Sequence, residues 1–128
     1  MDRKEVIAIL DGYCRERWAV SAAEEEVRSL EGDDKAEAEA RLKAAKAAAD
    51  EAKARAERLI SCCKDKRHAF VLRFRFLHLV REEGRRKRTV WRKRRWREVA
   101  AAVRYSTPMV KRFYHEAISE ILRQEDSS

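Results

Sequence analysis

The chain has few residues that form turns or end helices: its 128 residues include three glycines and one proline. Alanine, glutamate, lysine and arginine, which favour helix, are abundant, and charged residues make up 42% of the sequence. This composition predicts a chain that is helical over nearly all of its length. It is long enough for one small domain with an extension and too short for two independent cores.

Cysteine is also scarce, with Cys14 and the adjacent pair Cys62 and Cys63. Three is an odd number, and neighbouring cysteines rarely bond each other because the backbone between them would be strained. We therefore expect reduced thiols in a cytoplasm. The adjacent pair lacks the two-residue spacer of a zinc knuckle and the histidines are scattered, so we expect no metal site. The three histidines are His68, His78 and His115.

Long apolar runs and catalytic motifs are missing as well. No apolar run approaches the ~20 residues that cross a bilayer, and the amino terminus is charged, so we expect a protein that is neither secreted nor membrane-spanning. The sequence has no glycine-rich phosphate loop, no nucleophile elbow and no marked set of cysteine, histidine and acid. We expect neither enzymatic activity nor a cofactor.

Charge is divided unequally between the two halves of the chain. Residues 1–63 hold 12 Lys or Arg against 15 Asp or Glu, whereas residues 64–128 hold 19 against 8. Neutralising phosphates requires Lys and Arg gathered in space, so the basic half indicates a polyanion-binding module, with nucleic acid as the leading partner. The interpretation is a chain of two regions, 1–63 and 64–128.

Residues 1–63 show the pattern of two helices joined by a short turn. Apolar residues recur at helical spacing over residues 2–30, and residues 31–34 then supply a glycine and acidic capping candidates. The second helix carries a heptad series in steps of four and three: Ala38, Leu42, Ala45, Ala49, Ala52, Ala56, Leu59 and Cys63. Its alanines allow two backbones to approach closely, which favours an antiparallel hairpin, an Ala-rich coiled coil. The same seam could pair with a second copy, and a single solvated helix held by charge pairs is the alternative.

A third apolar stretch predicts a helix in the basic half, and a strongly basic segment follows it. The stretch contains Ala69, Phe70, Leu72, Phe74, Phe76, Leu77, Leu79 and Val80, which is too dense for an exposed helix. We expect this helix to end near Arg81 to Gly84 in a glycine cap, with a basic loop after it. Between Arg85 and Arg97 nine of thirteen residues are Lys or Arg. Such a run indicates a polyanion nearby, with a nuclear localisation signal or a solubilising loop as the alternatives.

Residues 91–122 predict a helix-turn-helix. The first short helix has one apolar face, formed by Trp96, Val99, Ala100 and Val103. Arg104 and Tyr105 then break the pattern, and Ser106 or Thr107 caps a second helix that has the single proline in its first turn. This helix carries a continuous apolar stripe: Val110, Phe113, Ala117, Ile118, Ile121 and Leu122. The predicted fold is all-α, an amino-terminal hairpin followed by a carboxy-terminal helix-turn-helix.

A helix-turn-helix places its second helix in the major groove of double-stranded DNA, where the residues at the start of that helix touch base edges. We expect base reading by Thr107, Pro108, Met109, Lys111 and Arg112. The expected contacts to the DNA backbone are Arg85, Arg86, Lys87, Arg88, Arg92, Lys93, Arg94, Arg95, Arg97, Arg104 and Ser106. A plain helical hairpin inside a core is the alternative interpretation.

The stretch WREVAAAVRYSTPMVKRFYHEAISEIL, residues 96–122, resembles region 4 of sigma-70-type factors. The first half of that family's pattern is matched by Trp96, Val99, Ala100, Val103, Arg104, Tyr105 and Ser106, with Arg104 standing at the turn glycine. The family's later buried positions correspond to Val110, Phe113, Ala117, Ile118 and Ile121. In such proteins the residues just after the serine read bases, which implies this role for Thr107, Pro108, Met109 and Arg112.

The long charged helical region ahead of this stretch is similar in architecture to small phage and prophage regulators of the RinA and ArpU type, which activate late genes. The resemblance implies a sequence-specific DNA-binding transcription regulator, encoded by a phage or prophage and located in the bacterial host cytoplasm with its nucleoid. The expected partners are double-stranded DNA, with RNA polymerase and a second copy bound through the amino-terminal helices as further candidates. Two alternatives stay open: a DNA-packaging subunit that resembles phage small terminases, and a coiled-coil interaction adaptor.

Overall fold

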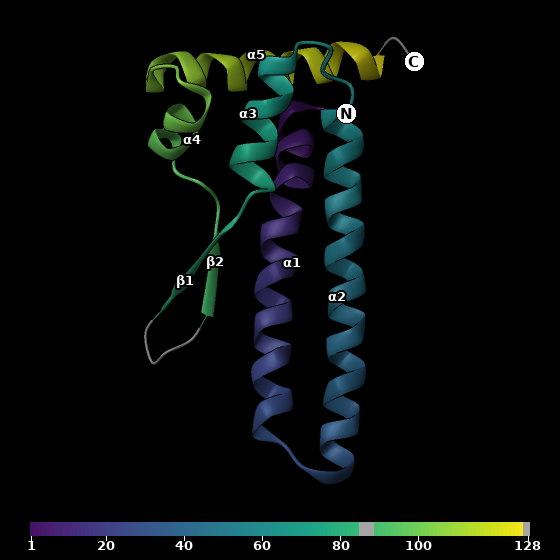
Figure 1. The fold of residues 1–128 in the computed structure, drawn as a ribbon. Coiled ribbons are helices and arrows are strands. Elements are labelled where there is room, and N and C mark those ends of the chain that lie inside the picture. The colour runs from purple at the N-terminus through teal and green to yellow at the C-terminus, as the bar shows by residue number, and fades with distance from the viewer. Residues whose placement is uncertain (85–88, 127–128) are drawn as a thin grey trace.

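The computed structural model describes residues 1–84 and 89–126, and most of them lie in helices. The elements follow in the order α1 (Arg3–Ser29), α2 (Gly32–Ile60), α3 (Lys66–Phe76), β1 (Val80–Glu83), β2 (Thr89–Arg92), α4 (Trp96–Val103) and α5 (Thr107–Asp126). In Figure 1, α1 and α2 stand side by side, α5 runs across one end of them, and α4 and the strands lie on the side of α1 away from α2. The chain is therefore mostly helical, as its composition predicts.

The helices α1 and α2 run in opposite directions and pack against each other along their length (Figure 1). They are joined by Leu30 and Glu31, and Gly32 opens α2 with a φ of 67°, a left-handed conformation that glycine adopts without a steric penalty. Every residue of the alanine-rich heptad series is buried or partly buried. Small side chains allow this close packing: a Cβ placed on Gly12 of α1 would lie 3.9 Å from the Cβ of Ala52.

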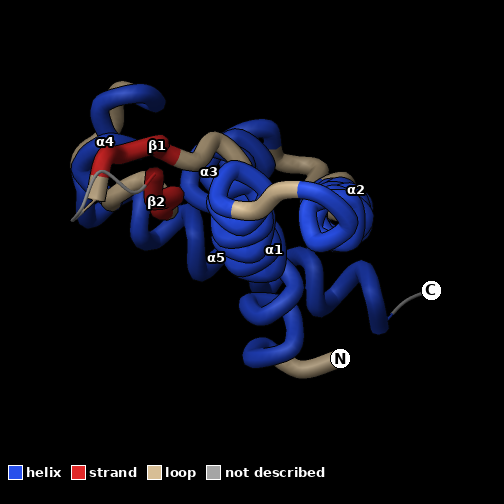
Figure 2. The backbone as a smooth tube through the Cα atoms, turned by 90° about the horizontal axis from the view of Figure 1, so that it is seen from below, coloured by secondary structure: helices blue, strands red, loops and turns tan. Residues whose placement is uncertain are grey.

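One hydrophobic core joins the base of this hairpin to the basic half of the chain. It contains Val6 and Leu10 from α1, Ile60 from α2, Leu72 from α3 and Ile118 from α5, all with no exposed surface. Both halves of the sequence therefore contribute to the same core, and Cys63, the last residue of the first predicted region, is one of its members. Figure 2, seen from below, shows α3 and α5 gathered around the end of α1.

The strands β1 and β2 are a departure from the all-α expectation. They pair antiparallel, with Val80 opposite Arg92 and Glu83 opposite Thr89. The helix α3 ends at Phe76, so the prediction that it extends to residues 81–84 was wrong, and residue 91 lies in β2 rather than in a helix. The dense apolar stretch from 69 to 80 spans two elements: the chain leaves α3 after Phe76, turns over residues 77–79 and enters β1 at Val80. Residues 85–88 lie outside the described part of the chain.

The described residues were searched for membrane-spanning helices and for groups of side chains that could hold a metal ion. No helix among them is long and apolar enough to span a membrane. Within the same residues, no group of three or more histidine, cysteine or acidic side chains is arranged to hold a metal ion.

The shared core predicts that the hairpin and the basic half unfold together. Ile118→Ala removes a fully buried side chain from this core and should lower the free energy of unfolding by about 2–5 kcal/mol. Thermal denaturation followed both by helical ellipticity and by tryptophan fluorescence should show one coincident transition. The matched control is Met109→Ala on the exposed face of the same helix, expected to change stability by less than about 0.5 kcal/mol. Two separate transitions would contradict a common core.

Candidate nucleic-acid interface

The turn between α4 and α5 consists of three residues, Arg104 to Ser106, and its geometry is tightly specified. Arg104 ends α4 with a φ of 61°, in the left-handed region that favours glycine, and its amide donates to the carbonyl of Ala100. Ser106 caps α5, because its hydroxyl accepts the amide of Met109 at 3.3 Å and its carbonyl accepts the amide of Val110 at 3.0 Å. The turn therefore fixes where α5 begins and in which direction it leaves α4.

A second hydrophobic cluster holds α4 and α5 against α3. It consists of Val71 from α3, Val99 and Ala100 from α4, and Val110 and Phe113 from α5. The buried residues of α5 recur at steps of three and four, so they share one face of the helix. The opposite face of its first turns is left exposed.

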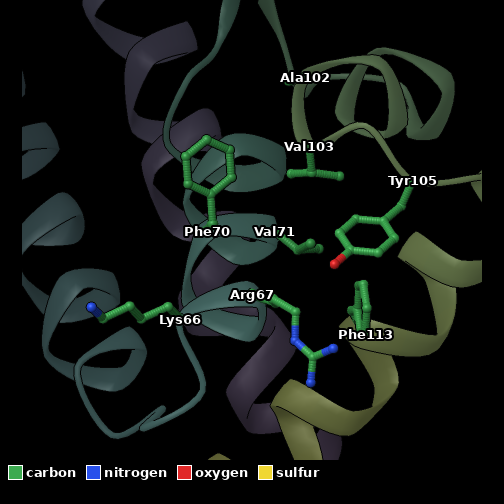
Figure 3. A pocket seen from close by; sticks show the side chains of 8 residues that line it. All are labelled: Lys66, Arg67, Phe70, Val71, Ala102, Val103, Tyr105 and Phe113. Carbon is green, nitrogen blue, oxygen red and sulfur yellow. The ribbon is translucent and has the colours of Figure 1, made fainter.

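A small cavity lies behind the turn, lined by side chains from α3, α4 and α5. Figure 3 shows it with Phe70 and Val71 on one side and Tyr105 and Phe113 on the other. The rings of Tyr105 and Phe113 meet edge to face with centroids 5.0 Å apart, and the guanidinium carbon of Arg67 lies 4.9 Å from the centroid of Phe113. These contacts tie the turn and the start of α5 to α3.

The predicted base-reading residues lie together at the start of α5. Pro108, Met109, Lys111 and Arg112 are exposed, and Thr107 is partly buried. Arg112 contacts the carboxylate of Glu116 one turn further along the helix, at 2.9 Å from its Nε. The spacing of the helix therefore presents a cationic and polar surface next to the capped amino end, where the helix dipole also favours anions.

The predicted backbone-contact residues divide into three groups. Arg85, Arg86, Lys87 and Arg88 lie outside the described residues. Arg92, Lys93 and Arg94 have partners inside the protein. Arg95, Arg97, Arg104 and Ser106 are exposed around α4 and the turn.

The three internally paired cations hold the strands to the rest of the fold. Arg92 contacts Glu82 through Nε and Glu98 through Nη1, both at 2.7 Å. Lys93 reaches Asp11 on α1 at 2.6 Å. Arg94 donates to the carbonyl of His78 at 2.8 Å and stacks over the Phe74 ring. These three side chains are partly buried and already have partners within the protein, whereas the exposed arginines around α4 are more accessible.

The carboxylate of Glu98 accepts hydrogen bonds from two residues of the basic segment. It accepts the guanidinium of Arg92 and also the backbone amide of Arg95 at 2.8 Å, which caps the start of α4. These hydrogen bonds, that from Arg92 first, lower the pKa of Glu98 to about 2. The side chain is therefore ionised throughout the neutral and mildly acidic range.

Two tryptophans of the basic segment are packing residues, and sequence reasoning missed their partners. The guanidinium carbon of Arg17 lies 4.5 Å from the centroid of Trp91, and that of Arg75 lies 4.6 Å from the centroid of Trp96. Burial lowers the pKa of Arg75. No sequence signal marks these pairs, because α1 and α3 lie far from the tryptophans along the chain.

The pKa of each of the three cysteine thiols is raised. Burial, followed by the nearby Glu120 carboxylate, raises the pKa of Cys63 to about 12, so this thiol stays protonated. Burial also raises the pKa of Cys14 and of Cys62. All three are free thiols.

In comparison with known proteins, no protein-family model matches this chain, and no curated protein and no solved structure matches it. The function of the surface at α4 and α5 is therefore argued from its own residues.

The left-handed turn residue predicts a stabilising substitution. Arg104→Gly should raise the free energy of unfolding by about 0.5–1 kcal/mol, because a non-glycine residue at this φ carries a steric cost that glycine avoids. Denaturant titration measures the change. Arg104→Ala is the control and should bring no such gain, since it keeps the Cβ. A gain of equal size from alanine would show that loss of the charge, not relief of the backbone, is responsible.

The pKa of Glu98 predicts a pH-dependent contribution to stability. A carboxylate whose pKa falls from 4.5 to about 2 on folding stabilises the protein above pH 4.5 and loses that effect as the pH falls through 2. Glu98→Gln should therefore lower the melting temperature at pH 7, and the difference from the unmodified chain should shrink between pH 4.5 and pH 2. Calorimetry over this range tests the sign. A difference that is constant with pH would mean that the charge of Glu98 is not what stabilises the fold.

Proposed function

We propose that this chain is a sequence-specific DNA-binding transcription regulator and that α4 and α5 form its helix-turn-helix. The observation that carries the proposal is the start of α5, which is capped, tied to α3 on one face and exposed on the other with Met109, Lys111 and Arg112. A helix held in this way can enter the major groove as a rigid unit. Its amino-terminal side chains would then meet base edges.

The exposed cations next to this helix suit a grip on the DNA backbone. Arg95 and Arg97 flank the start of α4, and Arg104 lies in the turn. Phosphate contacts fix the register of a protein on the duplex and carry no sequence information, whereas base contacts specify the site. We therefore assign base reading to Lys111, Arg112 and their neighbours, and backbone contact to the three arginines.

The conformation of Arg104 supports the comparison with region 4 of sigma-70-type factors. That family has a glycine at this turn, and Arg104 adopts a backbone conformation that glycine favours. The resemblance makes a promoter element a reasonable target and RNA polymerase a candidate partner. In this proposal, the α1–α2 hairpin serves as the contact to that partner or to a second copy.

Selection of bound duplexes from a random library tests the proposal, followed by affinity against salt for the selected and a scrambled duplex. Arg112→Ala should weaken the selected duplex by about 1–3 kcal/mol and leave the scrambled one little changed. Arg97→Ala should weaken both duplexes alike and reduce the slope of log affinity against log salt by about 1.

Two results would contradict the proposal in part or in whole, and a third would extend it. Equal losses on both duplexes for both variants would contradict the division into reading and gripping residues. Enrichment of no sequence would contradict the regulator and shift weight to the packaging subunit or the adaptor. A palindromic site would show that two copies bind together.

A further inference from the structure

A chain of polar contacts links the exposed start of α5 to the buried side of α3. Arg112 donates from Nε to one carboxylate oxygen of Glu116 at 2.9 Å, and the other oxygen of Glu116 lies 3.2 Å from Nε2 of His68. His68 is the one buried polar or charged residue among the described residues, with 8% of its surface exposed. Glu116 therefore connects a solvent-exposed arginine to a fixed group in the interior.

His68, the buried end of this series of contacts, is surrounded by several other groups. Nδ1 of His68 lies 3.2 Å from Glu120, and its ring packs against Phe113 with centroids 6.1 Å apart. Asp65, the capping residue of α3, lies 3.7 Å from Nε2. The Phe113 ring and the carboxylates around His68 hold the imidazole in place, so Glu116 has a packed partner behind it.

Glu116 keeps its charge, and its contact leaves the far end of Arg112 available. Hydrogen bonds from Arg112 and from His68 lower the pKa of Glu116, which favours its ionised form. Nε of Arg112 is the atom that donates to Glu116. Among the residues that the structure describes, neither terminal amino group of Arg112 has an acceptor. Such amino donors match the O6 and N7 acceptors of guanine.

Two physical effects follow at a DNA surface. An arginine already held in one conformation loses less rotamer freedom when it contacts a base, so its base contact is strengthened. A carboxylate beside the duplex repels phosphates on every sequence alike, so it lowers the affinity for all duplexes without changing their ratio. The first effect alone raises the ratio of specific to non-specific affinity.

We propose that Glu116 is a positioning residue for DNA specificity, which presets Arg112 for one base, a guanine, from an anchor on His68. The inference rests on the proposed function and deepens it, since it names the residue that gives α5 its discrimination and the base expected opposite Arg112.

The test measures affinity for the selected and the scrambled duplex with the full chain, comparing Glu116→Gln with the unmodified protein. The substitution should tighten the scrambled duplex by about twofold, because one negative charge is lost, and should lower the preference for the selected duplex by about threefold. A purely structural role would weaken both duplexes together. Glu51→Gln is the control for the loss of one negative charge: Glu51 lies on α2 and is paired with Arg58, so the change touches neither His68 nor Arg112. It should leave the preference unchanged.

A double-mutant cycle shows whether Glu116 acts through Arg112. In the Arg112→Ala background, adding Glu116→Gln should produce no further loss of preference. An equal loss of preference in both backgrounds would overturn the inference. So would a preference that Arg112→Ala lowers and Glu116→Gln alone leaves unchanged. Either result would leave the regulator proposal standing. If the unmodified chain selects no sequence, both proposals fail.

A measurement on the unmodified protein keeps the inference testable if Glu116→Gln does not fold. In the free protein, ¹⁵N relaxation should show the Nε–H bond of Arg112 to be more rigid than that of the exposed Arg97. Equal mobility at the two arginines would contradict preset geometry.

Discussion

The arrangement of the whole chain depends on burial of one face of α5. Ile118 and Ile121 enter the core shared with α1, α2 and α3, while Val110 and Phe113 enter the cluster shared with α3 and α4. Because residues three and four apart lie on the same face, a single stripe joins both clusters. The same packing leaves the other face of the first turns in solvent, so the surface proposed to read DNA is set by what lies beneath it.

Some cations of the basic segment hold the fold together and others stay exposed, and the composition does not show which are which. Closely spaced cations repel each other, and the fold relieves part of this repulsion by pairing Arg92 and Lys93 with carboxylates and stacking Arg94 on a ring. Each pairing fixes the two-stranded sheet to α1, α3 or α4. Arg95 and Arg97, a few residues further along, stay exposed. The local density of charge therefore does not show which cations are already paired within the protein.

The pattern of apolar residues was sufficient to predict most of the helical elements. The members of the heptad series are all buried or partly buried, and so is the apolar face of the predicted short helix in α4. Ser106 caps α5. Pattern reasoning failed at the strands, because four-residue strands are too short to show a clear alternation. Their position depends on packing against α1, where the Trp91 carbonyl accepts from Cys14 at 3.9 Å and its ring packs on Arg17.

The sequence by itself determined the helical character, the charge asymmetry and the residues at the start of α5, because helix periodicity, capping and charge are local properties. The tertiary structure decided which cations are free, how Arg17 and Arg75 pair with tryptophans, and how His68 comes to stand behind Glu116. These pairings join residues separated by tens of positions in the chain. They follow from the way α5 crosses α3 and the hairpin, and a local sequence pattern does not predict that crossing.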